Sequence, residues 1–353
     1  MTNPQRVLLH YFTNPGILEI KQDLLSLTSE ELGEFFVHSA FLSSAVNFLK
    51  DEHWLHREDI AAQEQSFQEF LAPYFGVELF SLRFLQAIVE KSSAKGLKEV
   101  GQQAQACELA VIQVIKSRTY SEQKVFAAKA LNLMLELFDL ENKWQVEKKA
   151  QGLHLGLSMY RTFDALDDVF NLDYSVDLGM KADLQETERL WEGAGVGVQS
   201  GYSTVSLALR HLNLPLGSRF IDLGSGYGRV GLIVGLLRPD IDFKGYEYVA
   251  HRVDIASSSS LNLGMQDHVH FYTQDLSLES FKIPEAEIYY MYDPFSEETY
   301  AHVLAQLVEI SRYKKIAIAT KGNARGWLLE VARREQWSTP EEFDNGNLCL
   351  FRS

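Results

Sequence analysis

A chain of 353 residues, of which 46% are hydrophobic and 23% charged, has an ordinary globular composition and room for about two domains. Two cysteines, Cys107 and Cys349, are too few for a disulfide framework. No uninterrupted apolar run approaches the roughly 18 residues of a membrane span, and the N-terminus lacks a secretory pattern. These features predict a cytoplasmic protein without a membrane segment.

The net charge of −15 argues against a nucleic-acid partner. Residues 1–200 hold 18 Lys and Arg against 29 Asp and Glu, and the densest basic groups of the chain are only pairs. Proteins that bind nucleic acids usually carry a basic face that neutralises phosphates. A neutral or cationic partner, either a protein or a small molecule, fits this charge better.

Residues 1–172 are predicted to form an all-helical domain. Thr28 and Glu31 have the spacing of a capping box, and Leu32, Phe35 and Phe36 follow at helical intervals. Two further helices are predicted from apolar residues at helical spacing: Cys107, Val111 and Val114, then Ala128, Leu131, Leu135 and Phe138. His53 and His56 are interpreted as a solvated helix face, so no metal site is predicted.

Residues 173–201 contain several glycines and are predicted to be a linker or a lid between two domains. From residue 202 to the end, helices alternate with short apolar strands, which is typical of a doubly wound sheet. The strands are predicted at Phe220, Ile241–Glu247, Val269–Thr273, Ile288–Tyr292 and Lys314–Thr320, followed by a hairpin around Asp344-Asn345-Gly346. The fold class is therefore α/β: a mostly parallel seven-stranded sheet ending in an antiparallel hairpin, preceded by a helical domain.

The segment FIDLGSGYGRVG, Phe220 to Gly231, joins a strand to a helix through three alternating glycines. Such a turn exposes backbone N–H groups at a helix N-terminus, where polar or anionic ligands bind. The pattern D-x-G-x-G-x-G resembles the first motif of the class I S-adenosylmethionine-dependent methyltransferases, and IYYMYDPF (Ile288 to Phe295) resembles their fourth. Gly226, Gly228 and Gly231 also match G-x-G-x-x-G, so an NAD(P)-dependent oxidoreductase remains an alternative.

The resemblance, which covers residues 202–353, implies S-adenosylmethionine as the cofactor and assigns roles to acids at the ends of strands. Asp222 would lie near its amino group, Glu247 would accept both ribose hydroxyls, and Asp275 would accept the adenine amino group beside Leu276. The residues expected to contact the cofactor are Asp222, Gly224, Ser225, Gly226, Gly228, Glu247, Tyr248, Asp275 and Leu276, with Gln199 and Tyr202 from the preceding segment.

Asp293, Pro294 and Phe295 are the predicted catalytic residues. They resemble the D/N-P-P-Y/F motif of amine-directed methyltransferases, but one proline is missing, which puts the stacking role of Phe295 in doubt. A carboxylate and a neighbouring carbonyl would orient an amine toward the methyl group. The alternative is that Asp293 only caps the next helix. Lys321 and Asn323, after the fifth strand, could also face the acceptor, but a plain loop is the favoured interpretation.

The sequence therefore predicts a methyltransferase, N-directed, whose helical domain selects a protein or small-molecule acceptor. A catalytically inactive cofactor-binding regulatory protein is the alternative from another class. The acceptor, the methylated atom and the oligomeric state stay open at this stage.

Overall fold

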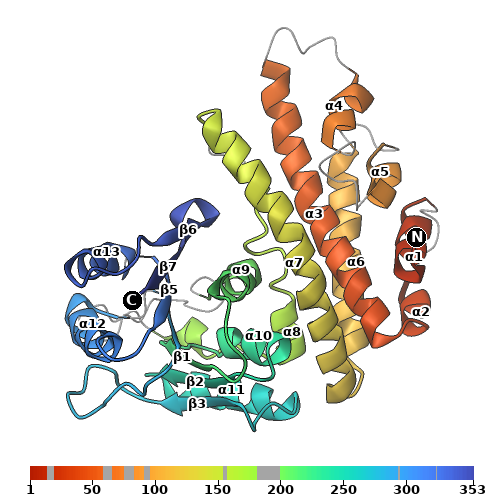
Figure 1. The fold of residues 1–353 in the computed structure, drawn as a ribbon. Helices are drawn as coiled ribbons and strands as arrows, with labels where there is room; N and C mark the ends of the chain where they lie inside the picture. The colour runs from red at the N-terminus through yellow and green to blue at the C-terminus, as the bar shows by residue number, and fades with distance from the viewer. Residues whose placement is uncertain are drawn as a thin grey trace. The chain divides into compact units, whose positions relative to one another are not determined.

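The computed structural model describes residues 1–13, 20–58, 66–74, 83–90, 96–153, 157–180, 199–292, 295–322 and 324–353. The chain divides into two compact units, Met1–Val169 and Phe170–Ser353 (Figure 1). Each unit is built around its own buried apolar residues.

The described part of the first unit is helical. Its helices are α1 (Asn3–Thr13), α2 (Ile20–Leu25), α3 (Ser29–Glu58), α4 (Phe67–Pro73), α5 (Arg83–Glu90), α6 (Leu97–Lys116) and α7 (Tyr120–Ala150), and α8 (Leu166–Phe170) follows at the boundary of the units. The predicted capping box before α3 is confirmed, because the Glu31 N–H donates to Thr28 Oγ1 (3.2 Å) and the Thr28 N–H donates to Glu31 Oε2 (2.9 Å). Thr119 and Glu122 form the same arrangement at the start of α7.

Helix α3 packs against both α6 and α7 and forms the centre of this unit. Among the described helices, the stretch Ser29–His56 is long and apolar enough to cross a membrane, with a mean hydropathy of 1.2. Of the apolar 18-residue window in this helix, 78% is buried within the protein, as in a core helix. Cys107, Val111 and Val114 face this core as predicted, whereas Ala128 and Leu135 of α7 are only half-buried.

The second unit contains the predicted seven-stranded sheet, in the order β3-β2-β1-β4-β5-β7-β6. The strands are β1 (Arg219–Leu223), β2 (Asp242–Glu247), β3 (Val269–Thr273), β4 (Ile288–Tyr292), β5 (Ala317–Lys321), β6 (Glu341–Phe343) and β7 (Leu348–Arg352). Strands β1 to β5 pair in parallel, and β7 pairs antiparallel with β5 and β6. The predicted fold class is confirmed.

Helices cover the two faces of the sheet (Figure 1). On one face, α12 (Glu297–Ser311) and α13 (Ala324–Arg334) pack on a core that includes Ile221, Met291 and Ile318. The other face carries α9 (Tyr202–Leu212), α10 (Arg229–Leu237) and α11 (Ala250–Asn262). Since side chains alternate between faces along a strand, Asp222 lies on the face opposite to Ile221.

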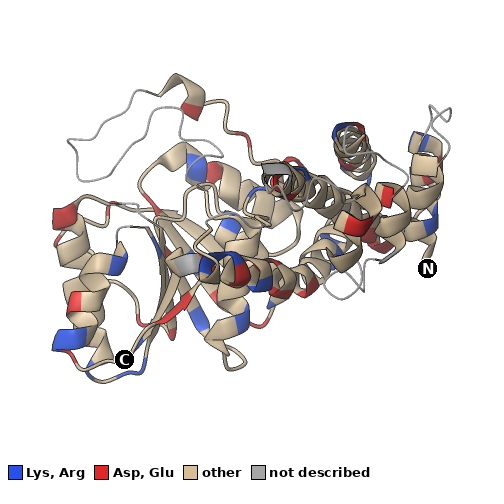
Figure 2. Cartoon of the chain, turned by 90° about the horizontal axis from the view of Figure 1, so that it is seen from above, with Lys and Arg blue, Asp and Glu red and all other residues tan. Residues whose placement is uncertain are grey.

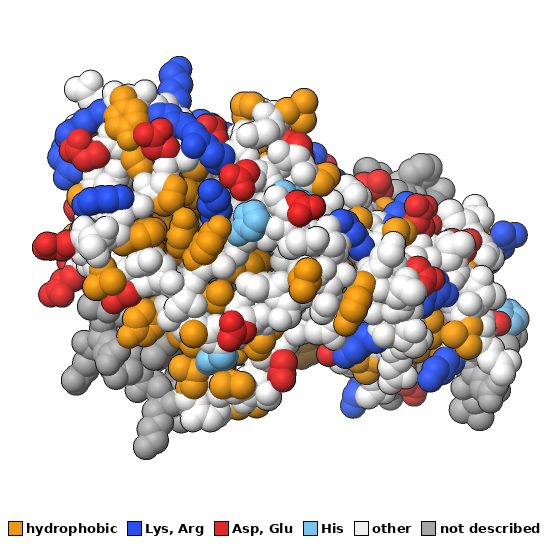
Figure 3. Space-filling model, turned by 90° about the horizontal axis from the view of Figure 1, so that it is seen from below, with side chains coloured by type: hydrophobic (Ala, Val, Ile, Leu, Met, Phe, Trp, Pro, Cys, Tyr) orange, Lys and Arg blue, Asp and Glu red, His pale blue; other side chains and the backbone are white. Residues whose placement is uncertain are grey.

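Along the chain, acidic and basic residues are interspersed in both units (Figure 2). On the face shown in space-filling form, the described basic side chains lie among acidic ones (Figure 3). This surface agrees with the mixed charge of the sequence.

Candidate functional site

The loop between β1 and α10 has a backbone that only glycine adopts readily. Gly224, Gly226 and Gly228 have φ angles of 91°, 53° and 81°, in the left-handed region. A Cβ at Gly228 would lie 2.6 Å from the Cβ of Ala256 and 2.7 Å from the ring of Phe271. Residues of α11 and β3 therefore leave no space for a side chain at this position.

Glu247, the last residue of β2, binds this loop. Its Oε2 accepts the N–H of Gly226 (2.9 Å), and its Oε1 accepts the N–H of Val249 (3.1 Å). The carbonyl of the preceding residue, Tyr246, accepts the N–H groups of Gly224 and Ser225, both at 2.9 Å. The ends of β1 and β2 are thus joined through the glycine loop.

Asp222 lies in β1 on the same face of the sheet as Glu247, because it pairs with Gly245, two residues before Glu247. Its side chain is buried, and the residue is 1% exposed. Burial, and next the charge of Glu247, raise the pKa of its carboxyl well above the usual value. Its Oδ2 has no hydrogen-bond partner among the described residues. A buried carboxyl of this kind is suited to a ligand that brings a donor or a positive charge.

The residues just before α9 reach the same loop. A Cβ at Gly226 would lie 3.2 Å from Nε2 of Gln199, so the Gln199 amide covers the glycine. The hydroxyl groups of Ser200 and Tyr290 are 2.8 Å apart, and the Ser200 carbonyl accepts Nη1 of Arg229 (3.1 Å). The structure therefore brings Gln199 to the loop. The predicted contact residue Tyr202 is 1% exposed, with the Arg229 guanidinium 4.7 Å from its ring centroid.

Asp275, Leu276 and Tyr248 follow the ends of β3 and β2. The Gln274 N–H donates to the Glu247 carbonyl (2.8 Å), which joins the ends of these strands. Oδ1 of Asp275 accepts the N–H of Ser277 (2.9 Å) and its hydroxyl (2.6 Å). Leu276 is 1% exposed and packs in the core, whereas Tyr248 is half-buried.

Of the predicted catalytic residues, Asp293 and Pro294 lie outside the described residues, as does Asn323. Phe295 is fully buried, and its ring packs edge-on against Tyr300 with 5.0 Å between centroids. The alternative role of Asp293 as a helix cap is wrong, because Ser296 caps α12: its Oγ accepts the N–H of Thr299 (3.3 Å).

Lys321 ends β5 beside Tyr292, the last residue of β4 and its register partner. Its ammonium group lies 4.9 Å from the Tyr292 ring centroid, and the side chain is 6% exposed. Burial lowers the pKa of Lys321 to about 8, although the charge of Asp344 acts in the opposite direction. In-register partners share a face, and Asp222 pairs with Tyr290, two residues before Tyr292. Lys321 therefore lies on the same face as Asp222.

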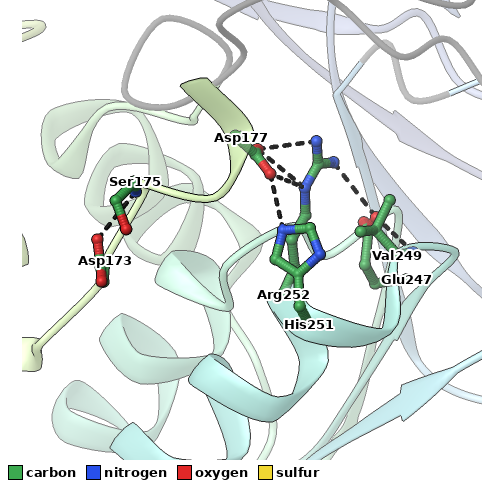
Figure 4. Close-up of polar contacts among 7 residues, drawn as sticks. All are labelled: Asp173, Ser175, Asp177, Glu247, Val249, His251 and Arg252. Atoms are coloured by element: carbon green, nitrogen blue, oxygen red, sulfur yellow. Dashed lines mark hydrogen bonds and ion pairs between the residues drawn. The ribbon is translucent and has the colours of Figure 1, made fainter. Parts of the chain in front are cut away.

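A cluster of acidic and basic side chains around Asp177 was not predicted from the sequence (Figure 4). Asp177 begins a short 3-10 helix, Asp177–Gly179, within the segment expected to be a linker. Its Oδ1 is 2.8 Å from Nε2 of His251, and its Oδ2 accepts Nε (3.1 Å) and Nη2 (2.9 Å) of Arg252. Nη1 of Arg252 lies 3.4 Å from Oε1 of Glu247. The only signal in the sequence was a basic pair, His251-Arg252, shortly after Glu247.

Within the described residues, no group of three or more His, Cys, Asp or Glu side chains is arranged to hold a metal ion. His53, one of the two histidines considered for such a role, packs against the rings of Phe67 and Phe70.

No protein-family model and no curated protein matches this sequence. Among solved structures, the chain is similar to TrmN from Thermus thermophilus, with 18% identity over 42% of this chain and 47% of that one and a TM-score of 0.35. It is also similar to precorrin-6y C5,15-methyltransferase from Geobacter metallireducens, with 11% identity over 45% of this chain and 90% of that one and a TM-score of 0.35. A third similar structure is that of an RNA methyltransferase from Salinibacter ruber in complex with S-adenosyl-L-homocysteine. It has 18% identity over 44% of this chain and 92% of that one and a TM-score of 0.34. The match spans less than half of the TrmN chain.

The sheet of the second unit ends with an antiparallel β7 between β5 and β6, and the resemblance to class I methyltransferases implies such an antiparallel hairpin at the sheet end. The expected class I methyltransferase-like fold is confirmed.

Proposed function

We propose that this protein is an S-adenosylmethionine-dependent methyltransferase whose cofactor binds at the glycine loop of the second unit. One observation carries the proposal. Asp222 and Glu247 lie on the same face of neighbouring parallel strands, next to a loop with three left-handed glycines. In open α/β sheets, ligands bind beyond the carboxyl ends of the strands, where this loop lies.

The described residues fit such a cofactor. The unpartnered Oδ2 of Asp222 suits the cationic amino group of its methionine part. Both oxygens of Glu247 suit the vicinal hydroxyls of a ribose. When bound, S-adenosylmethionine supplies a methyl group on a positively charged sulfur, and the leaving group is a neutral thioether. The protein then has to hold the acceptor in line with that methyl group.

The proposal extends to the acceptor. A protein or small molecule, methylated on nitrogen, suits the acidic net charge of the chain and the position of Asp293 after β4 in the sequence. The helical unit would select this acceptor. Tyr292 and Lys321 at the adjoining strand ends would lie beside it, because they share the face of Asp222.

A second candidate, an NAD(P)-dependent oxidoreductase, is favoured by one observation. A Cβ at Gly231 would lie 2.4 Å from the ring of Phe243, so Gly231 permits close packing of helix on strand. The third glycine of the dinucleotide fingerprint has this role. The antiparallel hairpin at the sheet end favours the methyltransferase instead.

A binding panel tests the cofactor. S-adenosylmethionine, S-adenosylhomocysteine, NAD and NADP would each be titrated in a thermal-shift assay and by calorimetry. A ligand that binds only the folded state adds about 2.7 kcal/mol at 100 times its dissociation constant. We expect the two sulfur compounds to stabilise the protein and Glu247→Ala to remove most of that effect. Asp242→Ala, at the opposite end of β2, is the matched control. Stabilisation by NAD alone would overturn the proposal.

A further inference from the structure

Residues 173–180 pack against the cofactor site at two points. Tyr174 contacts Tyr227, the residue between Gly226 and Gly228, with 4.5 Å between ring centroids. Asp177 contacts the start of α11 through His251 and Arg252 (Figure 4). Asp177 is 1% exposed, and the Arg252 side chain is 11% exposed, so these ion pairs are shielded from water.

The Arg252 guanidinium is bound mainly by Asp177. Two of its nitrogens lie 2.9 and 3.1 Å from Oδ2 of Asp177, which are ordinary hydrogen-bond distances. Its third nitrogen lies 3.4 Å from Oε1 of Glu247, which is long for a hydrogen bond. Arg252 therefore acts on Glu247 chiefly through its charge and binds its Oε1 only weakly.

The weak contact of Arg252 with Glu247 matters because of the hydrogen-bonding capacity of Glu247. A carboxylate has about four acceptor positions, two on each oxygen. The Gly226 N–H uses one position on Oε2, and the Val249 N–H uses one on Oε1. Two neighbouring hydroxyl groups require one further position on each oxygen. Among the described residues, the position on Oε2 is unused, and the one on Oε1 meets only the long 3.4 Å contact from Nη1 of Arg252. An Arg252 freed from Asp177 would take the position on Oε1.

We infer that Asp177 and Arg252 are positioning residues of the cofactor site: Asp177 holds the Arg252 guanidinium back, so that both oxygens of Glu247 can accept the ribose hydroxyls. This inference rests on the proposed function and adds residues 173–180 to the cofactor site. It gives a binding role to a segment that the sequence presents as a connection between domains.

Two ligands isolate the ribose contact: S-adenosylhomocysteine and its 2′,3′-dideoxy analogue, which lacks both hydroxyl groups. The Asp177→Asn variant keeps the shape of the side chain and an oxygen for His251, but loses the charge that holds Arg252. We expect its affinity for S-adenosylhomocysteine to fall about 10-fold, or about 1.4 kcal/mol, in calorimetric titrations. Affinity for the dideoxy analogue should change by less than about twofold.

Two further variants complete the experiment. Adding Arg252→Met to Asp177→Asn removes the competing guanidinium, so part of the lost affinity for S-adenosylhomocysteine should return. Asp173→Asn is the matched control, because Asp173 belongs to the same segment but bonds only to the N–H of Ser175 among the contacts of Figure 4. That control should bind both ligands like the unaltered protein. Thermal melting of each variant verifies that it is folded.

The outcomes separate the inference from the proposed function. If the unaltered protein binds no S-adenosylhomocysteine, the proposed function fails and the inference with it. If the unaltered protein binds but Asp177→Asn weakens both ligands equally, Asp177 only packs the segment and the inference is overturned. An unchanged affinity in Asp177→Asn, or no recovery on adding Arg252→Met, overturns it as well.

Discussion

At the scale of single residues, the buried carboxyl of Asp222 gives a pH test of the proposed cofactor site. Burial and the charge of Glu247 raise its pKa, so Asp222 keeps its proton to a higher pH than an exposed aspartate. A bound amino group carries a positive charge, favours the ionised form and lowers this pKa. Binding of S-adenosylhomocysteine should therefore release a proton wherever free Asp222 is protonated, and affinity should rise with pH until Asp222 is ionised. Calorimetry in two buffers of different ionisation enthalpy measures that release.

Two controls separate Asp222 from other titrating groups. Asp222→Asn cannot release the proton, so its affinity should vary less with pH. Adenosine lacks the amino-acid part of the cofactor and should bind without this proton release. Identical pH profiles for the unaltered protein and Asp222→Asn would show that Asp222 does not meet the amino group.

Lys321 predicts a pH dependence in the stability of the protein. Burial lowers its pKa from 10.5 to about 8. Between these values the unfolded chain binds more protons than the folded protein, so the free energy of unfolding rises with pH through this window. Below pH 8 the cost of the buried ammonium group is fully present. Lys321→Met should thus raise the free energy of unfolding at pH 7 by on the order of 1 kcal/mol, and the gain should vanish near pH 10.5.

Urea unfolding at pH 7 and at pH 10 measures this difference. Lys282→Met, which replaces an exposed lysine, is the control and should show no such change with pH. A Lys321→Met protein that is less stable than the unaltered protein at both pH values would mean that the contact with Tyr292 outweighs the burial of the charge.

Residues whose position follows from the end of a strand could be predicted from the sequence, and residues brought in by tertiary contacts could not. Asp222 and Glu247 close apolar strands beside a glycine turn, so the carboxyl ends of parallel strands place them together. Asp177 lies 75 positions before Arg252 in a segment without a regular apolar pattern. Nothing in its local sequence indicates that partner.

At the scale of elements, the alternation of helix and strand was enough to predict the sheet, but strand ends depend on pairing. The fifth strand was expected at Lys314–Thr320 and is observed at Ala317–Lys321. Lys314 instead follows α12, where its N–H donates to the Ile310 carbonyl (3.0 Å) and its ammonium pairs with Glu287. The strand begins at Ala317, which pairs with both Ile288 and Arg352. Such cross-strand partners are not visible in local periodicity.

The geometry of the glycine loop can be tested by replacing one of its glycines with alanine. Gly228→Ala places a methyl group in a left-handed backbone and within 2.7 Å of Phe271. Backbone strain costs about 1–2 kcal/mol and overpacking a further 1–3 kcal/mol. Gly264→Ala has a similar φ of 61° but nothing within 4 Å, so it reports the backbone cost alone. We expect Gly228→Ala to lower the free energy of unfolding more than Gly264→Ala and to abolish binding of S-adenosylhomocysteine.

Chemical unfolding of both variants, followed by titration with S-adenosylhomocysteine, checks this prediction. Equal destabilisation of the two variants would show that α11 and Phe271 move aside at little cost. Retained binding in Gly228→Ala would mean that the loop can carry a side chain without losing the cofactor.

At the scale of the whole molecule, the division of the chain between Val169 and Phe170 assigns residues 170–180 to the α/β unit. The Ser259 hydroxyl donates to the Phe170 carbonyl (2.5 Å), the Phe170 ring lies 6.1 Å from that of Tyr202, and Asp177 pairs with Arg252. A domain boundary drawn from glycine content alone would cut through these contacts. The position of the cut should therefore decide how well the isolated unit binds S-adenosylhomocysteine.

We expect a fragment starting at Phe170 to fold and to bind S-adenosylhomocysteine nearly as tightly as the full chain, because the contacts of Asp177 and Tyr174 are kept. A fragment starting at residue 181 lacks both, and its affinity should be about 10-fold lower or worse, as for Asp177→Asn. Circular dichroism verifies folding, and calorimetry measures binding. Equal affinity of the two fragments would exclude residues 170–180 from the cofactor site. If instead neither fragment folds while the full chain does, the helical unit is needed for the stability of the α/β unit, and a role limited to choosing the acceptor would be wrong.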